Sequence, residues 1–112
     1  MSELDKLIKE LVQFRDERDW EQFHNSKDLA LGISIEAAEL NELFLWKSKE
    51  ETENVDIERI KEELADILNY CFLLANKHNL SPVEIVREKV EKNRNKYPID
   101  KAKGNAKKYN EL

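Results

Sequence analysis

Four acidic side chains on two predicted helices are the residues of this chain best suited to chemistry. Glu36 and Glu39 lie in the segment ISIEAAELNEL, and Glu63 and Asp66 lie in EELADILNY. The members of each pair are three residues apart, so both carboxylates of a pair lie on one side of a helix. Four inward-facing carboxylates would repel one another unless a cation lay between them. The first hypothesis is therefore a divalent metal site.

The surroundings of these two pairs, rather than their spacing, set them apart. Small residues lie inside them, at Ala37, Ala38 and Ala65, and would allow a neighbouring helix to come close. No Lys or Arg within the two segments neutralises the acids, so each must be paired elsewhere, protonated or metal-bound. The same spacing occurs in five other acidic pairs, which are typical of solvated faces: Asp16/Asp19, Glu39/Glu42, Glu50/Glu53, Glu53/Asp56 and Glu88/Glu91.

The donor set indicates which metal would bind. Ligation by oxygen alone suits Mg²⁺ or Mn²⁺ and argues against zinc, which prefers His or Cys. A di-iron bundle would need two Glu-x-x-His units. Glu21 and His24 form one such unit, but Ala75 stands three residues before His78, so the second is missing.

Apolar residues recur at helical spacing in four segments, and they predict an all-α, four-helix bundle. We expect helices over residues 2–18, 28–46, 57–78 and 82–95, with the acid pairs on the second and third. Asn25 or Ser26 is expected to cap the second helix. With 38% charged residues in 112, the core would be thin. We therefore expect oligomerisation to complete the bundle.

The remaining segments predict little regular structure. Residues 47–56 read as a polar loop, and Pro98 is expected to end the fourth helix. Val83, Val86 and Val90 of that helix are expected to face the core. The predicted domain organisation is a helical domain over 1–97 and a basic tail over 98–112.

The charge distribution limits the kinds of partner. Residues 1–91 carry 12 basic and 22 acidic side chains, whereas residues 92–112 carry seven basic and two acidic ones. An acidic body argues against a nucleic-acid polymer, while the basic segment could contact the phosphates of one nucleotide. The single cysteine, Cys71, excludes an internal disulfide and fits a reducing compartment. Neither a signal pattern nor a membrane-spanning run is expected, which predicts a cytoplasmic protein.

Aromatic residues gather near the acids in sequence or in helical phase. Trp46 follows the first acid pair, Tyr70 lies one turn beyond Asp66, and Trp20 and Phe23 precede the second helix. Flat rings of this kind could stack on a nucleobase. Ordinary core packing is the alternative, and for Phe23 it is the better explanation.

These features together resemble the MazG-like all-α nucleoside triphosphate pyrophosphohydrolases. Glu-x-x-Glu followed by Glu-x-x-Asp is similar to the signature of that family. Further segments resemble its dCTP pyrophosphatase subgroup over nearly the whole chain: ERDWEQFH at 17–24, LFLWK at 43–47 (LFQWK there), EELADILNY at 62–70 (EELSDVLIY there), KNRNKYP at 92–98 and the KAKGNAKKY tail.

The resemblance implies hydrolysis of a nucleoside triphosphate, dCTP or a related nucleotide, to the monophosphate and pyrophosphate. It implies Mg²⁺ or Mn²⁺ held by Glu36, Glu39, Glu63 and Asp66, with one acid or a metal-bound water activating the nucleophile. It also implies a homo-oligomer, either a dimer or a tetramer. The substrate-binding residues carried over are Trp20, His24, Trp46, Tyr70, Lys89, Asn93, Arg94 and Lys96, with Lys101 and Lys103 as weaker additions.

The chain departs from this resemblance at two positions. Ile35 stands where many family members have a further acid, and Leu11 stands where the vertebrate dCTP enzymes have a histidine near the base. A broader deoxynucleotide preference therefore remains open. The alternative from another class is a non-catalytic helical interaction module whose acidic face binds a basic partner. Burial of the four acids would distinguish the two, because an interaction module would keep them exposed.

Overall fold

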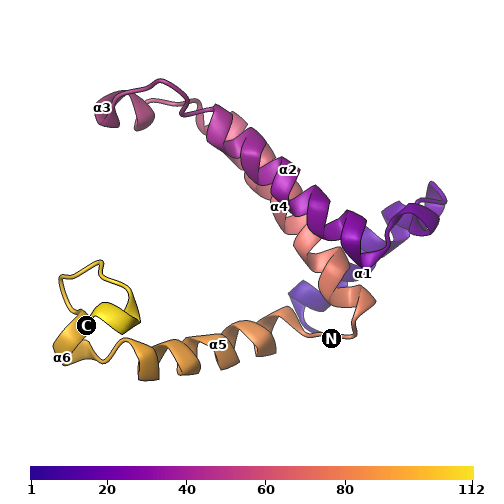
Figure 1. Ribbon diagram of the computed structural model, residues 1–112. Coiled ribbons are helices and arrows are strands. Elements are labelled where there is room, and N and C mark those ends of the chain that lie inside the picture. The colour runs from indigo at the N-terminus through magenta and orange to yellow at the C-terminus, as the bar shows by residue number, and fades with distance from the viewer. The chain divides into compact units, whose positions relative to one another are not determined.

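The computed structural model describes residues 1–112, and every regular element in it is a helix (Figure 1). The predicted all-α class, with four long helices, is confirmed. The long helices are α1 (Glu3–Glu17), α2 (Ser26–Glu42), α4 (Ile57–Lys77) and α5 (Pro82–Lys96). The short ones are the 3₁₀ helices η1 (Glu21–Phe23) and η2 (Tyr109–Glu111) and the single-turn helices α3 (Lys49–Thr52) and α6 (Ile99–Ala102).

Side-chain caps start the helices. Asn25 caps α2, because its side chain accepts a hydrogen bond from the backbone N–H of Asp28. α3 begins with a capping box, in which Ser48 and Glu51 each accept the other's backbone N–H at 3.1 Å. The prediction that residues 47–56 form a loop is therefore wrong over α3. The capping box was the signal that could have revealed it.

Two helix ends also differ from the prediction. α2 ends at Glu42 rather than Trp46, and the chain then turns through Trp46, whose φ of +60° is rare for a bulky residue. Pro98 follows the end of α5 as expected. Its carbonyl then accepts hydrogen bonds from Lys101 and Ala102, and so starts α6 in a tail predicted to be irregular.

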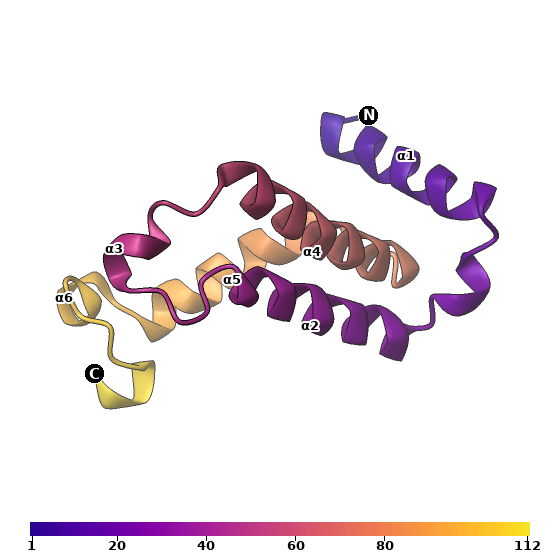
Figure 2. The same cartoon turned by 90° about the horizontal axis from the view of Figure 1, so that it is seen from above.

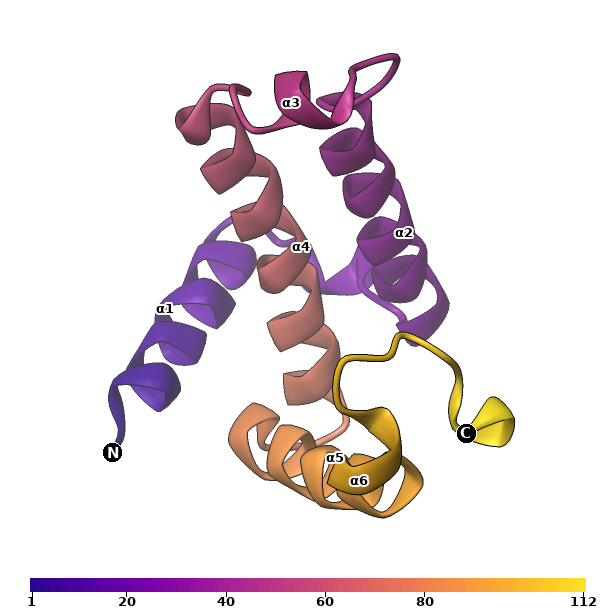
Figure 3. The ribbon, with the colours of Figure 1, turned by 90° about the vertical axis from the view of Figure 1, so that its left-hand side faces the viewer.

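The chain forms two compact units, residues 1–79 and 80–112. In the first unit α2 and α1 both pack against α4, and Figures 2 and 3 show them on opposite sides of it. In the second unit, the rings of Tyr97 and Tyr109 meet edge to face at 6.3 Å, and Lys96 lies over Tyr109. The predicted division into residues 1–97 and 98–112 stays a prediction.

Few apolar side chains are fully buried within one chain. The buried ones are Leu29, Leu43, Leu73 and Ala75. The expectation that Val83, Val86 and Val90 face a core is wrong within a single chain, since the least exposed of them, Val83, is 41% exposed. These valines lie on α5, a helix with no buried residue of its own. None of the helices combines the length and the apolar composition needed to cross a membrane.

Candidate metal centre and the adjoining pocket

The predicted acid pairs meet between α2 and α4. The hydroxyl of Ser26, at the start of α2, lies 2.8 Å from Nε2 of His78, at the end of α4, so the two helices run antiparallel. This arrangement brings one carboxylate oxygen each of Glu36, Glu39 and Glu63 within 4.8 Å of one another. Asp66 lies one turn further along α4, is exposed and falls outside this group of three, although its charge raises the pKa values of Glu36 and Glu63.

The cluster lacks compensating positive charge. None of the ion pairs in the protein reaches these four acids. Oε2 of Glu36 and Oε2 of Glu63 are both buried without a hydrogen-bond partner. A buried, unpaired carboxylate oxygen is unfavourable, so the acids must take up a proton or a cation. Carboxylate oxygens with free lone pairs are the ligands that Mg²⁺ and Mn²⁺ prefer, and the residues therefore fit such a metal.

The pKa values reflect this crowding. Burial raises the pKa of Glu36 to about 7, and Glu39, Asp66 and Glu63 add to the effect. Burial, followed by the neighbouring Glu39 and the charge of Asp66, also raises the pKa of Glu63. Both shifts have the cause expected of carboxylates that share one site without a cation.

These shifts predict a pH-dependent effect of the metal on stability. The folded protein holds a proton on Glu36 more tightly than the unfolded chain, for which the pKa is 4.5. Without metal, the free energy of unfolding should therefore fall as the pH rises from 4.5 towards about 7. A cation replaces the proton, so Mg²⁺ should raise the Tm more at about pH 8 than at about pH 5.

Thermal melts in EDTA and in Mg²⁺ at the two pH values measure this difference. Glu36→Gln should remove most of the pH dependence, because the glutamine neither ionises nor repels its neighbours. Glu50→Gln, a change to an exposed acid on α3, is the matched control and should leave it intact. An equal Mg²⁺ effect at both pH values would show that the acids are solvated.

A cavity of about 300 Å³ adjoins Asp66, the one acid of the four that lines it. Asp66, Tyr70 and Leu73 share one face of α4, since they are four and three residues apart, so this wall of the cavity begins at the acid cluster. The opposite wall comes from α1 and the turn that follows it. The full lining is Leu11, Phe14, Trp20, His24, Asp66, Asn69, Tyr70 and Leu73.

The end of α1 positions Trp20. Asp19 has φ +54°, and the N–H groups of Asp19 and Trp20 donate to the carbonyls of Asp16 and Arg15. This is the Schellman arrangement, with aspartate in the left-handed position that glycine usually occupies. The chain therefore reverses at a defined point and turns the Trp20 ring towards α1.

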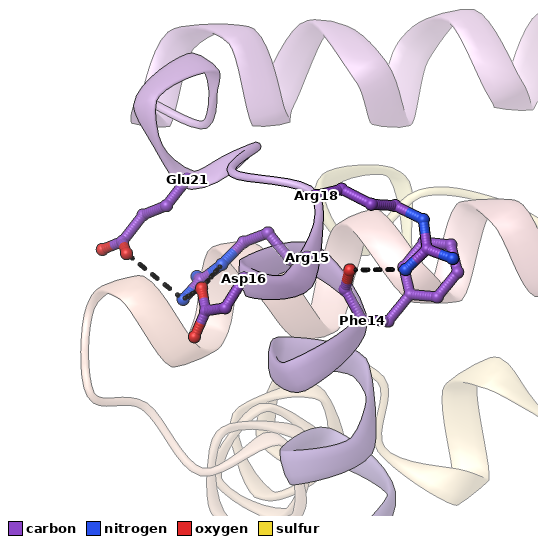
Figure 4. A network of polar contacts seen from close by, with 5 residues as sticks. All are labelled: Phe14, Arg15, Asp16, Arg18 and Glu21. Carbon is purple, nitrogen blue, oxygen red and sulfur yellow. Dashed lines mark hydrogen bonds and ion pairs between the residues drawn. The ribbon is translucent and has the colours of Figure 1, made fainter.

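Aromatic and charged contacts hold this turn together. The rings of Trp20 and Phe14 meet edge to face at 5.8 Å. The Arg18 guanidinium lies 3.7 Å from the centre of the Phe14 ring and donates to the Phe14 carbonyl (Figure 4). Arg15 pairs with Asp16 at 2.7 Å and approaches Glu21 at 3.6 Å (Figure 4). Trp20 is 43% exposed, so part of its surface is available to a ligand.

His24 brings a second polar group to the cavity. Its Nδ1 is buried without a hydrogen-bond partner, and its ring centre lies 6.5 Å from that of Tyr70. Burial lowers the pKa of His24, and the nearby Arg15 lowers it further. The ring is therefore neutral at neutral pH, with one nitrogen able to donate and the other able to accept.

Gly32 of α2 allows Tyr70 to occupy its place. A Cβ atom at Gly32 would lie 2.7 Å from two carbons of the Tyr70 ring, closer than any real contact. The absence of a side chain lets the ring lie directly against the α2 backbone. The glycine thus explains how Tyr70 packs between α2 and the cavity.

The structure does not bring all the predicted binding residues together. Trp46 follows the C-terminal end of α2, whereas Trp20 and His24 precede its N-terminal end, and a 17-residue helix is about 25 Å long. Within one chain Trp46, which is 93% exposed, does not line the cavity. The other predicted residues, Lys89, Asn93, Arg94 and Lys96, all lie on α5 in the second unit, and their roles stay predictions.

Four lining residues were not among the predicted site residues: Leu11, Phe14, Asn69 and Leu73. Phe14 belongs to the apolar pattern of α1 and is 46% exposed. The position of Asn69, one turn after Asp66 and next to Tyr70, was the available signal.

Comparisons with known proteins agree with one another. The sequence pattern of the MazG-like family matches residues 31–112. dCTP pyrophosphatase 1 of Rattus norvegicus is 38% identical over 106 residues, and that of Homo sapiens is 37% identical. The aligned region covers 90% of this chain but only 62% of either relative's length.

A solved structure shares the fold. The crystal structure of a pyrophosphatase from Archaeoglobus fulgidus has a TM-score of 0.83 and 40% sequence identity, and the match covers 88% of this chain and 94% of that one. The family pattern spans well over half of the chain, and the solved structure, which is 40% identical, shares its helical fold. The chain therefore belongs to the MazG-like family.

Proposed function

We propose that this chain hydrolyses nucleoside or deoxynucleoside triphosphates, dCTP or a related nucleotide, to the monophosphate and pyrophosphate. One observation carries the proposal: Glu36 and Glu63, each with a buried, unpaired carboxylate oxygen, converge one helical turn from Asp66, which lines a cavity with aromatic walls. The dCTP pyrophosphatase relatives support the same substrate class. The role we propose is clearance or balance of the nucleotide pool in the cytoplasm.

The four acids Glu36, Glu39, Glu63 and Asp66 would hold Mg²⁺ or Mn²⁺. When bound, the cation supplies positive charge against the negative charge of the phosphoryl oxygens during attack at phosphorus. The triphosphate would therefore lie at this end of α4.

The other residues of the site bind and orient the nucleoside. Glu63 and Tyr70 are seven residues apart on α4, about 10 Å along its axis, a separation suited to phosphates at one end and a base at the other. The rings of Trp20 and Tyr70 would bind the base by stacking. The neutral ring of His24 offers a hydrogen bond to the nucleoside without adding charge. Lys89, Asn93, Arg94 and Lys96 of α5 would contact the phosphates or sugar.

Self-association is part of the proposal. Large apolar side chains are exposed on several helices of the single chain, among them Leu7, Leu64 and Val86. A dimer or tetramer would cover such side chains. Trp46 would then bind substrate at the cavity of another copy rather than its own. Light scattering measures the assembly, and a purely monomeric protein at micromolar concentration would contradict this part.

The activity is tested by incubating the protein with a panel of triphosphates and Mg²⁺. Pyrophosphate release, with dCTP among the best substrates, is the expected result. Orthophosphate release, or no turnover of any triphosphate, would overturn the proposal. Burial divides the four acids, because Glu36 and Glu63 each bury an unpaired carboxylate oxygen, whereas Glu39 and Asp66 are exposed. The two buried oxygens favour the metal site over a non-catalytic module with an acidic face.

A further inference from the structure

Asn69 is a polar residue that lines the cavity but has no assigned role in capping a helix or in the acid cluster. It lines the cavity from α4, one turn beyond Asp66 and beside Tyr70. The Asn69 carboxamide makes no hydrogen bond within the chain, as is also true of Asn41, Asn76 and most other asparagines, and the residue is exposed. Its donors and acceptor are therefore available to a molecule in the cavity.

The other groups around Asn69 favour a flat, uncharged ligand at this point. Leu11, Phe14 and Leu73 give an apolar wall, and Trp20 and Tyr70 give ring faces. His24 is neutral, so no basic side chain lines the cavity. The negative charge is confined to the Asp66 end. A base rather than a phosphate is thus the part of a nucleotide suited to the space beside Asn69.

A carboxamide presents one acceptor oxygen and an amino group with two donors. The pairing edge of cytosine presents an amino donor next to a ring-nitrogen acceptor. Uracil and thymine present the reverse, a carbonyl acceptor next to a ring N–H donor. Turning the carboxamide over exchanges its donor and acceptor, so one asparagine can satisfy either edge when no neighbour fixes its orientation.

We propose that Asn69 reads the pairing edge of a pyrimidine base in this cavity and that, because its carboxamide is unconstrained, it accepts both cytosine and uracil. The inference deepens the proposed function and rests on it for the identity of the ligand as a nucleotide. It assigns base selectivity to a residue apart from the aromatic rings. Stacking on those rings is tolerant of sequence, because every base has a π-face.

The test uses two substitutions at Asn69 with opposite chemistry. Asn69→Asp keeps the acceptors and removes the donors, so it should favour cytosine, whose amino group donates, over uracil, whose carbonyl it repels. Asn69→Leu removes both and should weaken the two bases alike. Asn76→Asp places the same charge on an exposed position of α4 outside the cavity and is the matched control. Turnover is measured with dCTP and dUTP, and equilibrium binding with dCMP and dUMP by calorimetry.

The wild type should use dCTP and dUTP with kcat/KM values within about tenfold of each other, because the carboxamide can turn over to satisfy either base. Loss of a base contact of this kind changes selectivity by roughly 5- to 150-fold. Asn69→Asp should shift the preference towards cytosine by at least about tenfold, in turnover and in monophosphate binding. Asn69→Leu and Asn76→Asp should leave the ratio near its wild-type value. A wild type that rejects dUTP outright would also contradict the inference.

The two arms separate this inference from the proposed function. Triphosphate turnover with an unchanged cytosine-to-uracil ratio in Asn69→Asp would overturn the inference and retain the function. If the cytosine-to-uracil preference in monophosphate binding shifts in Asn69→Asp but no triphosphate is turned over, the inference is retained and the proposed function is overturned. A wild type that shows no turnover of any triphosphate and binds no monophosphate would overturn both the inference and the proposed function.

Discussion

Replacement of Glu63 with glutamine should lower the rate of pyrophosphate release from dCTP by about a hundredfold or more. The substitution keeps the size and one oxygen of the side chain but removes a charge from the acid cluster. The metal-free variant should nonetheless melt at a higher temperature than the wild type, because the buried charge of Glu63 and its repulsion by Glu39 and Asp66 are removed. Steady-state assays and thermal melts in EDTA measure the two effects.

Opposite changes in activity and stability are the diagnostic result for a functional site. Glu50→Gln is the matched control, since it makes the same chemical change at an exposed position of α3, and Glu50 contributes to neither of the raised pKa values. It should alter neither quantity appreciably. A Glu63→Gln variant with wild-type turnover would remove Glu63 from the site. A variant that lost stability together with activity would indicate a structural carboxylate instead.

Replacement of Trp20 with alanine should weaken substrate binding by roughly 5- to 150-fold, the range for loss of one base–aromatic stack. The weaker binding should appear as a higher KM with little change in kcat, because Trp20 lies away from the acids that would hold the phosphates. Steady-state kinetics with dCTP give both parameters.

Phe23 provides the comparison for Trp20. It is an aromatic residue of the neighbouring η1 helix, 62% exposed, and it does not line the cavity. Phe23→Ala should therefore leave KM within about twofold of the wild-type value. Equal effects of the two substitutions would mean that the turn, rather than the Trp20 ring, matters for binding.

The helix pattern could be predicted where local signals were strong. Asn25 caps α2 as expected, and apolar periodicity located α1 and α4 to within a residue. The end of α2 could not be predicted, because the apolar run Leu43–Trp46 contains neither glycine nor proline, and Trp46 adopts a backbone conformation that bulky residues rarely take. Packing of the buried Leu43 outweighs the local preference.

The acid cluster followed from the sequence because helical phase alone aligns the members of each pair. The cavity did not, since its walls come from α1 and α4, and no local pattern determines how two helices pack. For the same reason the helical spacing of Phe14 did not reveal that its ring packs under Arg18 and beside Trp20. Asn69 was overlooked because a lone asparagine on a helix is commonplace until its neighbours in space are known.

The central claim is that the acids of α2 and α4 form the metal centre on which activity depends. Titration with Mn²⁺, followed by electron paramagnetic resonance of the unbound ion, tests it without reference to turnover. The wild type should remove Mn²⁺ from solution, and a Glu36→Gln, Glu63→Gln double variant that remains folded should not. Equal binding by the two proteins, or no binding by the wild type at millimolar Mn²⁺, would contradict the claim.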